Sequence, residues 1–152
     1  MNQSIIGEIK KLDVLIGKKM YQCKKDKELD TIPSPFQMKI LEYLIWNEDN
    51  SINQKDLEDE LKVSKAAISG TIKSMEDNGL IKRKQSMLDA RAKDLVVTRK
   101  GKEEFEVMEE IFNSTDKEVA NKLTKDERKE FLTLVQKLQR ELEKDLDKKE
   151  RK

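Results

Sequence analysis

Residues 53–101 constrain the fold of this chain most strongly, because two helical patterns joined by a tight connection run directly into two short strand patterns. Asn53 begins the first, short helix. Ser64 is placed to accept a backbone N–H as the N-cap of a second helix over 64–78, which ends at Gly79. The segment therefore predicts a helix–turn–helix.

The second helix has two faces of different chemistry. Its buried stripe is Ile68, Ile72 and Met75, at helical spacing. The opposite face is small, polar and basic, and short side chains with hydroxyl and ammonium donors fit against phosphates and base edges in a major groove. The residues of this face are Lys65, Ala66, Ser69, Gly70 and Lys73.

A basic hairpin follows the second helix. Residues 80–84 and 95–98 have strand patterns, and residues 85–93 between them form a polar loop. Seven basic residues and two acidic ones lie between Lys82 and Lys100, whereas the whole chain has a formal net charge of only +1. Concentrated positive charge is what a nucleic-acid binder needs. The alternative is a solvated charged hairpin, since 41% of the chain is charged. The seven basic residues are Lys82, Arg83, Lys84, Arg91, Lys93, Arg99 and Lys100.

Three motifs follow one another after the second helix: Gly79-Leu-Ile-Lys-Arg83, Asp89-Ala-Arg91 and Val97-Thr-Arg-Lys-Gly101. In this order behind a helix–turn–helix, they resemble the winged helix–turn–helix of the MarR family of bacterial transcription regulators. The resemblance covers essentially the whole chain. It implies a mainly α fold with a small β-hairpin wing and with N- and C-terminal dimerisation helices.

The resemblance also implies how DNA is contacted. Arg91 would lie at the tip of a wing over 84–94 and enter a minor groove, where a narrow A·T-rich groove attracts arginine. Asp89 would pair with Arg91 and orient it. The predicted DNA-binding residues are Ser64, Lys65, Ala66, Ser69, Gly70 and Lys73 of the recognition helix and Lys84, Asp89, Arg91 and Lys93 of the wing.

Two of these positions depart from the family pattern. Many relatives have a hydroxyl at the position of Ala66 and an arginine at that of Gly70, so direct readout of bases is thinner here. Gly70 also costs about 1 kcal/mol of helix propensity relative to alanine. It serves either close approach of the backbone to DNA or no role on an exposed surface.

Three apolar stripes flank this region and predict a homodimer. The third helix begins near Thr98 and has Phe105, Met108, Ile111 and Phe112 on one face. One small winged domain cannot cover all three stripes, although packing within the chain accounts for part of each. We predict a dimerisation region over 1–33 and 102–152 and a DNA-binding lobe over 34–101. The terminal stripes are Ile5, Ile9, Leu12, Ile16 and Cys23 near the N-terminus and Phe131, Val135, Leu138, Leu142 and Leu146 near the C-terminus.

A further helix begins with Ser34 as N-cap, Pro35 in the first turn and Gln37 three residues after the cap. In MarR-like proteins small molecules bind where this region meets the dimer helices. The resemblance thus makes four residues candidates for an effector pocket, although ordinary packing in the core or at its rim is favoured for each. They are Tyr21, Met38, Trp46 and Met108.

Cys23 raises a second functional hypothesis, a repressor that senses oxidants through a thiol. Neighbouring lysines favour a thiolate, whereas its place on an apolar stripe favours an inert buried thiol. A single cysteine is typical of a reducing cytoplasm. No signal peptide and no segment approaching the ~20 apolar residues of a membrane span is visible, so we expect a cytoplasmic protein without a membrane partner.

Enzyme and metal-sensor functions are disfavoured by the composition. The chain has no histidine, and neither a phosphate-binding glycine loop nor a nucleophile constellation is visible, so we expect no metal, no cofactor and no enzymatic activity. Two function classes remain. The first is a homodimeric transcription regulator, in the family more often a repressor, that binds a pseudo-palindromic operator in double-stranded DNA and is released by a small effector. The second is a winged-helix module for protein–protein assembly. The basic hairpin and the Asp-x-Arg motif favour the first.

Overall fold

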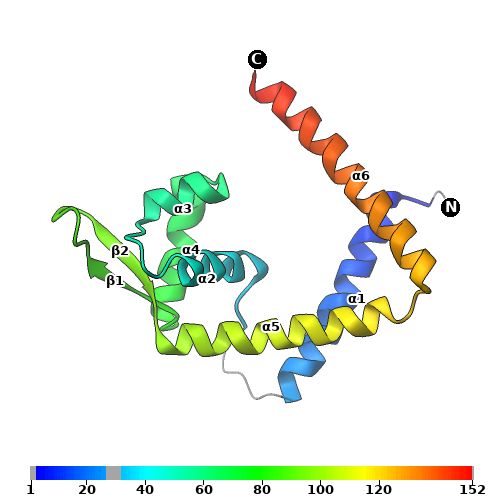
Figure 1. Cartoon of the computed structure of the whole chain (residues 1–152), viewed down its shortest axis with the longest axis horizontal. Helices are drawn as coiled ribbons and strands as arrows, with labels where there is room; N and C mark the ends of the chain where they lie inside the picture. Colours follow the sequence, from blue (N-terminus) through cyan, green and yellow to red (C-terminus); the bar gives the residue numbers. More distant parts are fainter. Residues whose placement is uncertain (1–2, 27–31, 152) are drawn as a thin grey trace. The chain divides into compact units, whose positions relative to one another are not determined.

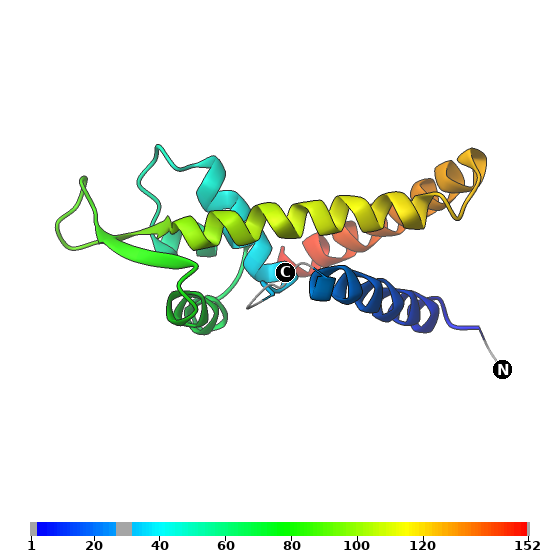
Figure 2. The same cartoon turned by 90° about the horizontal axis from the view of Figure 1, so that it is seen from below.

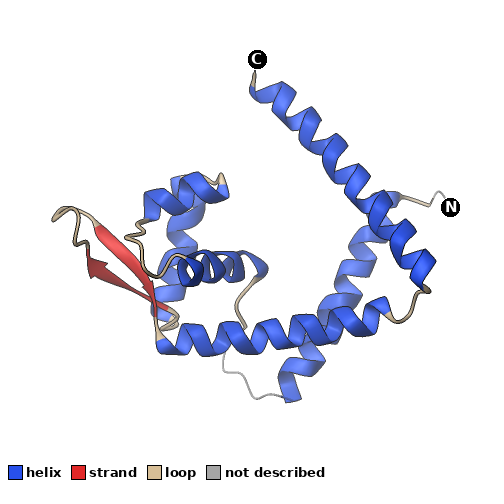
Figure 3. Cartoon of the chain, in the orientation of Figure 1, coloured by secondary structure: helices blue, strands red, loops and turns tan. Residues whose placement is uncertain are grey.

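The computed structural model of the protein describes residues 3–26 and 32–151, in which six α-helices and one two-stranded antiparallel sheet are present (Figures 1 and 3). The predicted mainly α fold with one small β-hairpin is confirmed. The elements are α1 Ile5–Asp26, α2 Pro35–Trp46, α3 Gln54–Leu61, α4 Lys65–Asp77, β1 Ile81–Gln85, β2 Lys93–Val97, α5 Arg99–Ala120 and α6 Lys125–Glu150.

The chain divides into two compact units, residues 1–112 and 113–152, and the boundary falls within α5. The first unit holds α1 to α4, the hairpin and the first part of α5. The second holds the remainder of α5 and all of α6. This division reflects contacts within one chain, so the assignment of 1–33 and 102–152 to dimerisation stays a prediction.

The core of the first unit is formed by the apolar faces of α2, α3, α4, the hairpin and the start of α5. The predicted stripe of α4, Ile68, Ile72 and Met75, is completely buried, which leaves the small and basic face of this helix outside the core. The buried core residues are Ile40, Leu41, Leu44, Ile52, Leu57, Ile68, Ile72, Met75, Leu80, Ile81, Leu95, Val97 and Phe105.

Side-chain caps set the starts of the helices that lead to this core. At α2 the Ser34 hydroxyl accepts from the Gln37 backbone N–H while the Gln37 side chain accepts from the Ser34 N–H, as predicted. Between α3 and α4, Lys62 adopts the left-handed conformation, with φ 53° and ψ 48°, and the Val63 N–H donates to the Glu58 carbonyl. This tight turn fixes the angle between the two helices of the helix–turn–helix.

The end of α4 is a Schellman motif centred on Gly79. Gly79 has a φ of +73°, a region that glycine enters without a Cβ penalty. The Leu80 N–H donates to the Met75 carbonyl and the Gly79 N–H to the Glu76 carbonyl, both at 2.9 Å. Because Leu80 and Met75 are both buried, this motif also seals the core where β1 begins.

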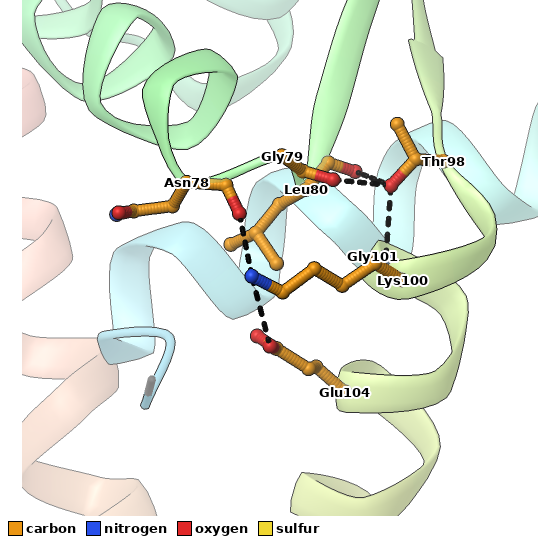
Figure 4. A network of polar contacts seen from close by, with 7 residues as sticks. All are labelled: Asn78, Gly79, Leu80, Thr98, Lys100, Gly101 and Glu104. Atoms are coloured by element: carbon orange, nitrogen blue, oxygen red, sulfur yellow. Dashed lines mark hydrogen bonds and ion pairs between the residues drawn. The ribbon is translucent and has the colours of Figure 1, made fainter. Parts of the chain in front are cut away.

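A latch joins the end of α4 to the start of α5 (Figure 4). We define the latch as Thr98, Lys100 and Gly101 together with the backbone of Asn78, Gly79 and Leu80 that they contact. The Thr98 hydroxyl donates to the Gly79 carbonyl at 2.5 Å and accepts from the Gly101 N–H at 3.0 Å. The Thr98 backbone N–H donates to the Leu80 carbonyl at 3.0 Å.

Lys100 adds a second bond to the latch. Its ammonium group donates to the Asn78 carbonyl at 2.9 Å and lies 3.8 Å from the carboxylate of Glu104, a buried residue one turn further along α5 (Figure 4). Asn78 is the C-cap of α4, where the helix dipole places partial negative charge. The end of α4 is therefore held by a cation that α5 supplies.

At Gly101 the backbone at the start of α5 packs directly against the Leu80 carbonyl, just after the end of α4. A Cβ built on it would lie 2.2 Å from the Leu80 carbonyl oxygen and 2.8 Å from Cγ1 of Val97. The first of these atoms belongs to the backbone and cannot move aside without breaking the latch. This position therefore requires glycine.

In the second unit, α6 begins with a capping box. The Thr124 hydroxyl accepts from the Glu127 backbone N–H, and the Glu127 carboxylate accepts from the Thr124 N–H. The bond from the Thr124 backbone, with a smaller contribution from its hydroxyl, lowers the pKa of Glu127 below its ordinary value. The capping contribution of this charge is thus present above the ordinary pKa of glutamate and is lost as the pH falls through the lowered pKa. No residue of α6 is buried.

Two identical substitutions should have opposite effects on stability. Gly101→Ala should lower the free energy of unfolding by ~1–3 kcal/mol, because the methyl group would collide with the Leu80 carbonyl. Gly70→Ala should raise it by up to about 1 kcal/mol, because a Cβ there meets no atom within 4 Å and alanine has the higher helix propensity.

Urea unfolding followed by circular dichroism at one fixed protein concentration measures both effects. The Gly70→Ala variant controls for the general benefit of alanine in a helix. A Gly101→Ala protein as stable as the native one would contradict the close approach.

Candidate nucleic-acid interface

The face of α4 that points away from the core carries the predicted recognition residues. Lys65, Ala66, Gly70 and Lys73 are exposed. Ser64 is also exposed, and its hydroxyl oxygen accepts from the Ala67 backbone N–H at 3.2 Å, so it acts as the predicted N-cap. Because the Ser64 hydroxyl only accepts in this bond, its proton stays available to a ligand.

Ser69 is in a more restricted position than the others. Its hydroxyl donates to the Lys65 carbonyl at 2.7 Å and accepts from the Gln54 side-chain amide at 2.9 Å. The single proton of the hydroxyl is thereby used, and one lone pair remains. Ser69 is thus suited to accept a hydrogen bond and not to donate one, unless its bond to Lys65 breaks.

Gln54 is a site residue that the sequence analysis did not identify. It begins α3 and is half-buried against α4, where it holds the Ser69 hydroxyl. The bond spans fifteen positions in sequence, and a glutamine in the first turn of a helix has no distinctive pattern. Only the packing of α3 on α4 reveals it.

The hairpin leaves the core almost at once. β1 pairs with β2 in antiparallel register from Ile81 opposite Val97 to Gln85 opposite Lys93. Only Ile81 of β1 is buried, so residues 82–85 are exposed to solvent on the hairpin. The strands lie within two residues of the predicted positions, and the connecting tip is residues 86–92.

Three of the seven basic residues of this region are neutralised by acidic partners. The guanidinium of Arg83 pairs with Glu76 of α4 at 2.8 Å, Arg99 pairs with Glu103 at 3.0 Å, and Lys100 belongs to the latch. The other four are exposed and form no ion pair within the described part of the chain, so their charge is available to a polyanion. These free cations are Lys82, Lys84, Arg91 and Lys93.

A hydrogen bond to Asp89 helps to fix the turn at the wing tip. The Asp89 carboxylate accepts from the Arg91 backbone N–H at 2.9 Å. No ion pair joins the side chains of Asp89 and Arg91, both of which the structure describes. Asp89 therefore orients Arg91 through the backbone of the turn, whereas the resemblance implied pairing with its side chain.

The base of the wing is fixed to the loop before α3. The Ser51 hydroxyl lies 2.7 Å from both carboxylate oxygens of Asp94, and the Leu95 N–H donates to the Ile52 carbonyl at 2.7 Å. Asp94 therefore anchors the hairpin through Ser51, whereas the free cations on the same strands have no such structural role among the described residues.

Three of the four predicted effector-pocket residues line one apolar pocket of about 280 Å³ within the first unit. They are Tyr21 of α1, Met38 of α2 and Met108 of α5. Trp46 does not line it, because it lies at the far end of α2 with 75% of its surface exposed. The other lining residues are Gly17, Met20, Lys24, Ile32, Pro33, Pro35 and Phe112.

Cys23, metal ligation and membrane insertion were three further possibilities. Cys23 is a half-buried free thiol on α1. Over residues 3–26 and 32–151 no group of three or more metal-ligating side chains comes together. In the same residues no helix combines the length and apolar character needed to cross a bilayer.

Comparison with known proteins agrees with this architecture. Residues 34–93 match the model of the MarR family. Over 91 residues the chain is 33% identical to the HTH-type transcriptional regulator BilQ of Clostridioides difficile (strain CD3), a match that covers 59% of this chain and 62% of that protein. The chain spans about three fifths of the length of the curated relatives it matches.

Solved structures share the fold over nearly the whole chain. The heme sensor protein PefR from Streptococcus agalactiae, in complex with heme, superposes with a TM-score of 0.72 at 23% identity, covering 90% of this chain and 92% of PefR. The S. aureus MepR–DNA complex gives a TM-score of 0.67 at 18% identity, covering 91% and 96%. Residues 34–93 therefore match the MarR family, and over about nine tenths of its length the chain shares the fold of these two solved structures.

Proposed function

We propose that this protein is a homodimeric transcription regulator that binds a pseudo-palindromic operator through α4 and the wing. The observation that carries the proposal is the set of four free cations on a hairpin anchored beside an exposed recognition helix. The regulator BilQ and the DNA complex of MepR, to which the chain is similar, support the same function.

The exposed face of α4 reads the major groove in this proposal. Lys65 lies in the first turn, where the positive end of the helix dipole attracts phosphate. Ser69 accepts from an exocyclic amino group of adenine or cytosine, because its own proton is already used. Lys73, two turns later on the same face, contacts the backbone.

The wing reads a minor groove. Arg91 is exposed at the tip and its backbone is held by Asp89, so its guanidinium enters a narrow groove at little entropic cost. Lys84 and Lys93 lie at the two ends of the strands nearest the tip and neutralise phosphates. These contacts position the protein on DNA and read its shape.

A second copy of the chain covers the apolar surfaces that one copy leaves exposed. On α1 and, in the other unit, on α6, large apolar side chains face solvent. Exposed apolar surface of this extent marks an interaction site. The residues on α1 are Ile5, Ile6, Ile9, Leu12, Val14 and Leu15, and those on α6 are Phe131, Leu132, Leu134, Leu138, Leu142 and Leu146.

A small apolar effector in the pocket of Tyr21, Met38 and Met108 would release the operator and so relieve repression. The pocket is lined almost entirely by apolar atoms, which suits a compact hydrophobic molecule. Met108 lies on α5, whose first turn grips the end of α4 through the latch. A ligand that displaces α5 therefore acts on the recognition helix through the hydrogen bonds of the latch.

Binding to the DNA upstream of the protein's own gene tests the proposed function. Arg91→Ala should weaken binding by ~1–3 kcal/mol, because the groove contact is lost, while the thermal midpoint stays unchanged because the side chain is exposed. Fluorescence anisotropy at several salt concentrations measures the affinity.

Lys39→Ala, which removes one exposed cation from α2, is the matched control and should bind as the native protein does. Equal affinities of the Arg91→Ala and native proteins at moderate salt would remove Arg91 from the site. Absence of any specific complex with the native protein would favour a protein–protein assembly module instead.

Two variants separate reading by Ser69 from its structural bond. Ser69→Ala and Gln54→Ala should each cost about 1 kcal/mol of stability, because each removes the hydrogen bond between α3 and α4. Only Ser69→Ala should also change the base preference within a half-site, since Gln54→Ala leaves the hydroxyl in place. Urea unfolding and selection of DNA from a random pool measure the two effects. Identical selected sequences for Ser69→Ala and native protein would show that Ser69 does not read bases.

A further inference from the structure

We propose that Met87 and Leu88 form an apolar wedge at the wing tip that inserts against the bases of the minor groove entered by Arg91. This inference rests on the proposed DNA binding and adds a non-electrostatic contact to it. It concerns two side chains that the sequence analysis placed in a polar loop.

The exposure of these two residues is the first observation. Met87 is 88% exposed and Leu88 is 84% exposed, the highest values among the exposed large apolar residues that the structure describes. In Figures 1 and 2 the tip of the hairpin extends away from the helices of the first unit. The pair therefore lies outside the core, on the exposed tip of the wing.

The conformation of the tip is preset by hydrogen bonds. The hydroxyl of Ser86, a buried residue, accepts from the backbone N–H groups of Leu88 at 3.1 Å and Asp89 at 3.3 Å. The Gln85 side-chain amide donates to the Ala90 carbonyl at 2.6 Å. These bonds spare the tip much of the entropy cost of ordering when it binds.

A crevice behind the wing is the other place these side chains could occupy. Met87 and Leu88 border it together with Ser51 and Asp94. The crevice is lined by apolar residues such as Leu44, Ile52 and Val97 as well as by the carboxylates of Glu48 and Asp49. Met87 and Leu88 nevertheless remain almost fully exposed, so they do not fill it. The structure thus leaves the pair for a partner.

The charges around the pair identify that partner. Lys84, Arg91 and Lys93 surround the tip as free cations, so the occupant must combine dense negative charge with apolar surface between the charges. A minor groove has this arrangement, with phosphates along both rims and with sugars and base edges inside. Apolar side chains inserted between base steps there unstack the bases and kink the duplex. Flexible pyrimidine–purine steps should accept the wedge best.

The wedge predicts an affinity loss without a change in salt dependence. The double variant Met87→Ser, Leu88→Ser should bind the operator about tenfold more weakly than the native protein. Its slope of log affinity against log salt should equal the native slope, because no cation is removed, whereas Arg91→Ala should lower the slope by roughly one ion.

The design includes a control and a direct probe of the bases. Trp46→Ser removes another large, exposed apolar side chain, away from the wing, and should leave affinity unchanged. The fluorescent base 2-aminopurine, placed at the step under the wing, should brighten with native protein as it unstacks, and should not brighten with the double variant.

Each outcome decides between the two proposals. Native affinity and native brightening with the double variant would overturn the wedge while leaving the proposed DNA binding intact. A weaker complex with a lowered salt slope would also overturn it, since the substitutions would then act by displacing the cations. Failure of the native protein to form any specific complex would overturn the proposed function and the wedge together.

Discussion

The close approach of Gly101 to the Leu80 carbonyl is the constraint on which the proposed DNA-binding surface depends. At this point α4 ends, the hairpin begins and returns, and α5 starts, so four elements are fixed by a few backbone atoms. The Thr98 hydroxyl and the Lys100 ammonium then satisfy carbonyl groups at the end of α4 that the helix itself leaves unpaired. An ion pair between Lys102 and Glu48 ties α5 to the loop after α2 as well.

The hydrogen bonds and charges divide into those that build the surface and those left for a ligand. Arg83, Arg99 and Lys100 are paired with Glu76, Glu103 and Glu104, whereas the free cations of the hairpin have no acidic partner among the described residues. Counting charges along the sequence overestimates the positive surface for this reason. The available positive charge is nevertheless concentrated on the hairpin, so a chain with a formal net charge of only +1 still presents a basic surface there.

Short-range patterns in the sequence were sufficient to predict where several of the helices begin and where α4 ends. The caps at Ser34 and Ser64 and the buried stripe of α4 depend on residues three or four apart, and each is confirmed. The motif Gly79 to Arg83 marked the exit of α4 because a left-handed glycine and a buried Leu-Ile pair are short-range features. Family resemblance added the fold around them.

Contacts between elements could not be predicted in this way. The bonds from Gln54 to Ser69, from Glu76 to Arg83 and from Ser51 to Asp94 join residues whose spacing follows no period. The family resemblance made Trp46 a candidate pocket residue, with ordinary packing favoured, yet at the last turn of α2 its side chain is mostly exposed. Met87 and Leu88 were missed because a short apolar pair within a polar loop carries no pattern, and only their exposure on a fixed turn makes them notable.

The central claim, that two copies of this winged domain read DNA together, is tested most directly by footprinting the native protein on sequences it selects from a random pool. A symmetric dimer placing two α4 helices in successive major grooves predicts two inverted half-sites with centres about 10–10.5 bp apart. Protection should extend into a minor groove outside each half-site, where the wings bind. A footprint over a single half-site, or half-sites at variable spacing, would contradict the account.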